Sequence, residues 1–140
     1  VYSTRILLNT RSLLRFRLGM HPRFASGILR LLQAFLMMLL KDPGRDIFDP
    51  DPGGGLLRLV SVGYGRSESR KILQDVVLAV DRAKSSLMAK QARNHSLALA
   101  EKLSSARVVS STFDRNLQTL IVEVEVRNQT GKAASANLAL

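Results

Sequence analysis

The chain has 140 residues, of which 46% are hydrophobic and 5% aromatic, with no Cys, no Trp and a formal net charge of +10. This length suits a single domain, residues 1–140, large enough to bury roughly two thirds of its unfolded surface. The lack of Cys excludes disulfides, thiolate metal sites and a Cys nucleophile, and the few aromatic residues indicate no aromatic-lined ligand pocket.

The N-terminal segment, residues 1–27, is basic. Residues 1–41 contain seven Lys or Arg and no Asp or Glu, which favours nucleic acid, an anionic membrane or an acidic protein surface without selecting among them. No stretch reaches the about 20 apolar residues of a membrane span, and the segment lacks a signal-peptide pattern. Residues 1–20 fit either a helix or a strand. The candidate basic contact surface comprises Arg5, Arg11, Arg15 and Arg17.

A helix is predicted from about Pro22 or Ser26 to Leu40, because Leu and Phe recur there at steps of three and four residues. Asp42-Pro43-Gly44 ends it, since Pro43 disfavours helical geometry in the preceding residue and Gly44 accepts a positive φ. The helix is apolar on nearly all sides, which predicts a central position in the core.

The segment 42–55 is predicted to be a loop, because three Pro and four Gly exclude regular structure there. Ile47 and Phe48 are expected to anchor this loop to the core. Asp49 and Asp51 fit turn residues better than a catalytic pair. Gly53-Gly54-Gly55 lacks the Lys-Ser/Thr of a phosphate loop, so we interpret it as close backbone packing or a sharp turn. A short helix is expected at 56–60.

Residues 67–103 contain neither Pro nor Gly and predict one long helix, or two helices joined near Asn94-His95. Its apolar stripe comprises Ile72, Val76, Val80, Ala83 and Leu87. Two strands follow, at 106–113 and 117–127, and 133–140 is expected to return as the last strand of a hairpin. The predicted class is α+β: N-terminal helices, one of them long, packed on a small C-terminal antiparallel sheet that ends in a β-hairpin.

The terminal hairpin, 117–140, offers an edge to which a partner strand could be added. The alternative is that 133–140 merely closes its own sheet. This strand is rich in Ala, so it is expected to pack weakly alone, and truncation after Thr130 is expected to leave a folded core. The candidate hairpin residues are Leu120, Val122, Val124, Val126, Leu138 and Leu140.

No catalytic, metal or cofactor site is predicted. His21 and His95 are the only histidines and have no second ligand nearby in the sequence, and no Ser lies in a G-x-S-x-G context. We therefore expect a protein that is not an enzyme.

The order of these features resembles the baseplate wedge family of contractile phage tails, which has relatives in type VI secretion and carries a "lysozyme-like" label in some descriptions. The resemblance covers residues 28–131. It rests on an apolar helix running into Asp42-Pro43-Gly44, then Phe48-x-Pro50 and Gly53-Gly54-Gly55-Leu56, and later Arg107-Val108 and the alternating strand 120–126 before Thr130-Gly131.

The resemblance implies a structural role in the virion, in a sixfold array around the tail tube, after assembly in the host cytoplasm. Expected partners are other wedge proteins, the tail sheath protein and the tail tube, with no nucleic acid, membrane or cofactor. The hairpin would template the first sheath ring by strand addition. The implied wedge-partner contacts are Pro43, Gly44, Pro50, Gly53, Gly54, Gly55 and Arg107.

The sequence departs from the family where Glu-Pro-Arg often precedes the strands. Arg107 matches the Arg, but Ser105 and Ala106 replace Glu and Pro. Two other functions stay open on charge alone: a basic nucleic-acid-binding module, and a peripheral membrane binder acting through residues 1–20.

Overall fold

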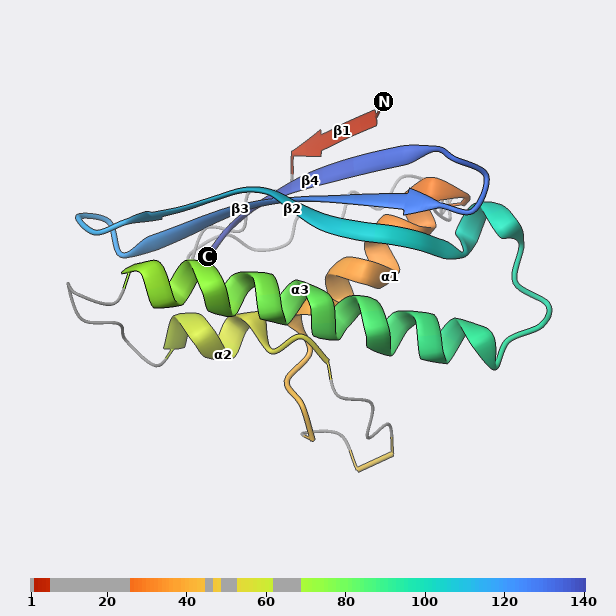
Figure 1. The fold of residues 1–140 in the computed structure, drawn as a ribbon, viewed down its shortest axis with the longest axis horizontal. Helices are drawn as coiled ribbons and strands as arrows, with labels where there is room; N and C mark the ends of the chain where they lie inside the picture. Colours follow the sequence, from red (N-terminus) through yellow and green to blue (C-terminus); the bar gives the residue numbers. More distant parts are fainter. Residues whose placement is uncertain (1, 6–25, 45–46, 49–52, 62–68) are drawn as a thin grey trace, which may run out of the picture.

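The computed structural model describes residues 2–5, 26–44, 47–48, 53–61 and 69–140. A layer of helices covers one face of a four-stranded sheet (Figure 1). The helices precede the three antiparallel strands of the C-terminal half, which confirms the α+β prediction. The elements are β1 (Tyr2–Arg5), α1 (Ile28–Leu40), α2 (Leu56–Ser61), α3 (Ser69–Ala92), the 3-10 turn η1 (Leu99–Glu101), β2 (Leu103–Asp114), β3 (Thr119–Asn128) and β4 (Ala133–Ala139).

The strands lie in the order β1-β4-β3-β2. β2, β3 and β4 form two consecutive antiparallel hairpins, whereas β1 pairs in parallel with β4 from Tyr2↔Ala134 to Arg5↔Asn137. This N-terminal strand makes the sheet mixed. Sequence periodicity did not distinguish it from a helix, because four residues are too few to establish a period.

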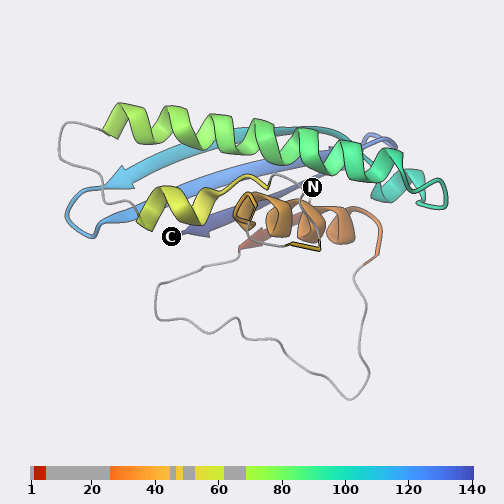
Figure 2. The same cartoon turned by 90° about the horizontal axis from the view of Figure 1, so that it is seen from below.

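The core lies between the sheet and the helices. α1 packs on β3 and β4, and α3 packs on β2 (Figure 2). The predicted stripe of α3 is buried throughout, from Ile72 at 1% exposed to Leu87 at 4%. α1 buries seven residues but exposes Leu29 and Met37, so it is a core helix with one open side rather than a helix buried all round.

The long helix ends before residue 103, the last position of the segment predicted to be helical. α3 ends at Ala92, and the chain after Asn94 forms only the turn η1 before β2 begins at Leu103. The Oδ1 atom of Asn94 accepts hydrogen bonds from the backbone N (3.2 Å) and the hydroxyl (2.8 Å) of Ser96. This local turn competes with helical hydrogen bonding and separates the helix from the sheet.

The three consecutive glycines bring the chain back to the C-terminal end of α1. The backbone N of Gly54 donates to the carbonyl of Met38 (2.9 Å), and that of Gly55 donates to Lys41 (3.0 Å). Gly55 has a φ of +68°, which favours glycine, and its carbonyl accepts the first bonds of α2. The prediction of close backbone packing and a sharp turn is confirmed.

The prediction that Ile47 and Phe48 anchor the loop was wrong. Ile47 is 90% exposed and Phe48 is 96% exposed. The loop is instead closed at its base, where Gly54 and Gly55 donate hydrogen bonds to carbonyls at the C-terminal end of α1.

The prediction that the last strand packs weakly was also wrong. Ala134, Ala136 and Leu138 are each 1% exposed, and Leu140 is 7% exposed. Leu140 and Leu120 exchange backbone hydrogen bonds, each of 2.9 Å. β4 lies inside the sheet, where small Ala side chains let α1 approach it closely, so it belongs to the core rather than to a detachable tail.

Asn128 holds the turn between β3 and β4, and its replacement is expected to be costly. The side chain is buried; Oδ1 accepts from the backbone N of Lys132 (2.9 Å) and from Thr130, and Nδ2 donates to the carbonyl of Ala100 (2.9 Å). We expect Asn128→Ala to lower the free energy of unfolding by about 3 kcal/mol, since buried polar groups lose their partners. Urea denaturation measures this. Asn116→Ala, in the exposed β2–β3 turn, is the control and should change stability by less than about 0.5 kcal/mol.

Candidate functional site

β2 is a long outer strand of the sheet. It pairs with β3 on one side, and no other strand of the described residues pairs with its opposite edge. Such an edge presents unpaired backbone N–H and C=O groups to which another strand can be added. Register irregularities between Leu103 and Ser105 and between Val108 and Ser110 interrupt its pairing with β3, and these features limit indiscriminate edge association.

Arg107 lies on this edge strand, on the sheet face away from the helices. Its Nε donates to Oε1 of Glu125 on β3 at 3.2 Å, and its side chain remains 69% exposed. The ion pair uses Nε of Arg107, so the other N–H groups of its guanidinium lie beside the unpaired backbone edge of β2. Arg107 is therefore accessible to a partner.

The opposite edge of the sheet differs from what the sequence predicted. The hairpin strand β4 was expected at the edge, but β1 pairs with it over Ala134–Asn137. The edge of β4 thus already holds an added strand, which comes from the distant N-terminus. Arg5 lies in that strand, whereas Arg11, Arg15 and Arg17 fall outside the described residues.

The candidate hairpin side chains do not face outward. All six are buried, from 0% exposed at Val122 to 7% at Leu140, and they contribute to the core beneath the helices. Their role is to fix the register and orientation of the hairpin. The residues that alternate with them on β3 face outward instead: Ile121, Glu123, Glu125 and Arg127. The alternation seen in the sequence could have identified them as the accessible set.

The implied wedge contacts separate into surface and buried groups. Gly44 is exposed and Pro43 is half-buried, so this turn is accessible. Gly53, Gly54 and Gly55 are buried against α1. They therefore pack inside this chain and do not lie on its surface. Pro50 falls outside the described residues.

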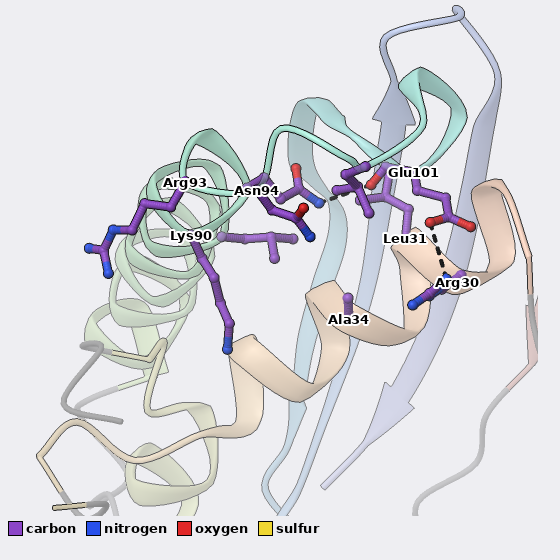
Figure 3. Close-up of a pocket in the computed structure, with 10 residues that line it drawn as sticks. Arg30, Leu31, Ala34, Lys90, Arg93, Asn94 and Glu101 are labelled. Carbon is purple, nitrogen blue, oxygen red and sulfur yellow. Dashed lines mark hydrogen bonds and ion pairs between the residues drawn. The ribbon is translucent and has the colours of Figure 1, made fainter. Parts of the chain in front are cut away.

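A pocket of about 410 Å³ lies between α1, the C-terminal part of α3 and η1, and we call it the α1–α3 pocket (Figure 3). Its buried floor is formed by Leu31 and Leu87. Sequence reasoning missed it, because its lining combines residues more than fifty positions apart with no common motif. The lining comprises Arg30, Leu31, Ala34, Leu87, Lys90, Gln91, Arg93, Asn94, Leu97 and Glu101.

Among the described residues, no group of His, Asp and Glu is arranged to hold a metal ion. Within that same part of the chain, no helix combines the length and apolarity needed to cross a membrane. No protein-family model, curated protein or solved structure matches the chain.

Proposed function

We propose that this chain is a structural subunit of a contractile phage tail baseplate, which joins the wedge around the tail tube and accepts strands of the first sheath ring. The proposal rests on the sequence resemblance over residues 28–131 and on the exposed positions of Gly44 and of Arg107. Its place of action would be the tail baseplate.

The observation that carries the proposal is the arrangement of the sheet edges. The edge of β4 holds a four-residue parallel strand from a remote part of the chain, and the twelve-residue β2 has an outer edge with no partner among the described strands. Backbone hydrogen bonds supply most of the affinity when a strand is added to a sheet. A neighbouring subunit could therefore add a strand beside β2, or exchange one for β1, without changing the core.

The first experiment is co-sedimentation of the protein with purified contractile tails after a high-salt wash, quantified by mass spectrometry. Stoichiometric retention is the expected result. Complete loss, with the sheath and other baseplate proteins retained, would contradict the proposal. Salt-sensitive retention on nucleic acid instead would favour the basic binding module, because each phosphate contact releases counterions.

Replacing Arg107 separates a role in assembly from a role in folding. We expect Arg107→Ala to change the free energy of unfolding by less than about 1 kcal/mol, because its ion pair is largely exposed. The same variant should lower retention on tails. Arg127→Ala, an outward-facing change on β3, serves as the matched control. Equal retention of both variants would remove Arg107 from the wedge contact.

A further inference from the structure

The inward-facing side chains of β2 are covered less completely than those of the strand beside it. Val108 and Phe113 pack against the core but remain half-buried. Their cross-strand partners on β3, Val124 and Leu120, are 0% and 1% exposed. The difference arises because β2 has a described strand on one side only. A further strand beside β2 would therefore bury apolar surface as well as form backbone hydrogen bonds.

The long helix extends over the place that such a strand would take. α3 packs on β2, and Figure 2 shows that its N-terminal half lies outside β2, on the side away from β3. Neighbouring strands lie about 4.8 Å apart, so a strand added to β2 would lie beneath this half of α3. A second copy could not supply its own β2 there, because the two α3 helices would come closer than the about 8–10 Å that packed helices need.

The side of α3 that faces this place is largely apolar. Gln91 identifies it, since Oε1 of Gln91 accepts a hydrogen bond from the backbone N of Leu103, the first residue of β2, at 2.7 Å. Leu73 lies about five helical turns before Gln91 and therefore on the same side of the helix, with Val77 about one turn after Leu73. Leu73 is half-buried and Val77 is 47% exposed. Both offer apolar contacts to a strand beneath α3, and Lys84 adds a cation about two turns after Val77.

The outward face of β2 carries opposite charges at two positions along its edge. Arg107 uses Nε in its 3.2 Å ion pair with Glu125, and its side chain is 69% exposed. Asp114 ends the strand, where its Oδ1 accepts hydrogen bonds from two backbone N atoms of the turn. The partners of Arg107 and Asp114 on β3, Glu125 and Thr119, lie on one face of that strand, so both side chains point away from the helices. Because like charges directly opposite each other in a sheet are destabilising, a partner strand is favoured with a carboxylate opposite Arg107 and disfavoured with one opposite Asp114.

We propose that the edge of β2, together with the apolar side of α3, binds one extended strand of another protein. The strand would place apolar side chains toward Leu73 and Val77 and a carboxylate opposite Arg107. An acidic strand suits the net charge of +10 and pairs with the backbone edge, whereas nucleic acid would leave the edge and the apolar side chains without partners. The inference rests on the proposed function only for the identification of that protein as a neighbouring tail subunit.

Fluorescence anisotropy with a labelled synthetic peptide tests this site on the isolated full chain. The probe has about eight residues, enough to span 107–114, with Val and Thr alternating and one Glu at its amidated C-terminal end. Antiparallel pairing, the more stable kind, places that Glu beside Arg107. We expect saturable binding. Arg107→Glu and, separately, Val77→Glu should each weaken it by at least about tenfold, because they place a carboxylate against the charged and the apolar side of the strand. Circular dichroism checks that each variant is folded.

Each variant has a matched control outside the site. Arg127→Glu, on the outward face of β3, makes the same change in net charge as Arg107→Glu. Leu78→Glu places the same carboxylate at the neighbouring position of α3, in a pocket whose described lining belongs to α3 alone. Both controls should bind the probe as the wild-type chain does. A probe with Lys in place of Glu should prefer the Arg107→Glu chain.

The proposal is overturned if the probe shows no saturable binding, or if the Leu78 control loses as much affinity as Val77→Glu. It is also overturned if a probe N-methylated at its four central residues binds equally well, since that peptide lacks the N–H donors of a strand. Duplex DNA binding that depends on Arg107, with no binding of the probe, would assign the site to nucleic acid instead.

The tail experiment separates this inference from the proposed function. A chain that is retained on tails but does not bind the probe contradicts the strand site alone. A chain that binds the probe but is lost from tails contradicts the tail assignment alone.

Discussion

Truncation after Lys132, which removes β4, is expected to abolish cooperative folding of the chain. The deletion removes the buried side chains of Ala134, Ala136, Leu138 and Leu140 and exposes the inner edge of β3. Burying one Leu in a core contributes about 2–5 kcal/mol, and whole domains are stable by only about 5–15 kcal/mol. The remaining β2–β3 pair would also be a two-stranded sheet, which is marginal in water. Far-ultraviolet circular dichroism and a thermal melt measure the outcome.

Deletion of residues 1–5 is the matched control for this truncation. It removes β1, which lies at the outside of the sheet and pairs only with β4. We expect the shortened chain to keep a cooperative unfolding transition. A cooperative transition in the chain truncated after Lys132 would contradict the central position of β4. The result also bears on assembly, because a loss of sheath nucleation in that truncation would report unfolding rather than a missing contact.

Gly54→Ala is expected to lower the free energy of unfolding by about 3 kcal/mol or more, because it overpacks the junction of α1 and α3. A Cβ atom at this position would lie 2.7 Å from the carbonyl oxygen of Leu39 and 2.8 Å from that of Ala79. Both neighbours are backbone atoms of helices, so they cannot rotate away as a flexible side chain would. The two helices would have to separate, which would loosen the core between them. Urea denaturation of the variant measures the change.

Gly44→Ala distinguishes crowding from backbone strain. Gly44 has a φ of +73°, but a Cβ atom there would meet nothing within 4 Å. We therefore expect a cost of only about 1 kcal/mol, which is the strain of a non-glycine residue with positive φ. Equal destabilisation by the two substitutions would contradict close packing as the role of Gly54, because Gly54 has no positive φ.

The helices and the central hairpin could be predicted from residue patterns alone. The stripe of α3 from Ile72 to Leu87 and the alternation of β3 from Leu120 to Val126 are both buried as their periods require. Long, regular periods report burial directly, because each position on one face meets the same environment. The close packing of the three glycines was also predictable. No Lys-Ser/Thr pair follows them, which left close backbone packing or a sharp turn as their role.

The candidate site was harder to predict because accessibility is a property of the assembled layers. The alternation of β3 established that its two faces differ, but not that the edge of β4 would be covered by a strand from the N-terminus. Pairing of β1 with β4 joins residues at opposite ends of the chain, and no local pattern encodes which edge such a short strand selects. The exposure of Ile47 and Phe48 could not be predicted either, since hydrophobic residues are expected to be buried. The backbone hydrogen bonds that close this loop at its base are not visible in the sequence.

The sequence by itself determined the α+β class, the periodic helices, the breaking segments and the strong positive charge of this protein, since local spacing and composition encode these properties. The tertiary structure alone decided that β4 lies inside the sheet, that β2 has the open edge and that residues of α1, α3 and η1 enclose one pocket. These features depend on contacts between segments distant in the chain. Such contacts form only when the layers pack, and the same hydrophobic pattern is compatible with more than one arrangement of them.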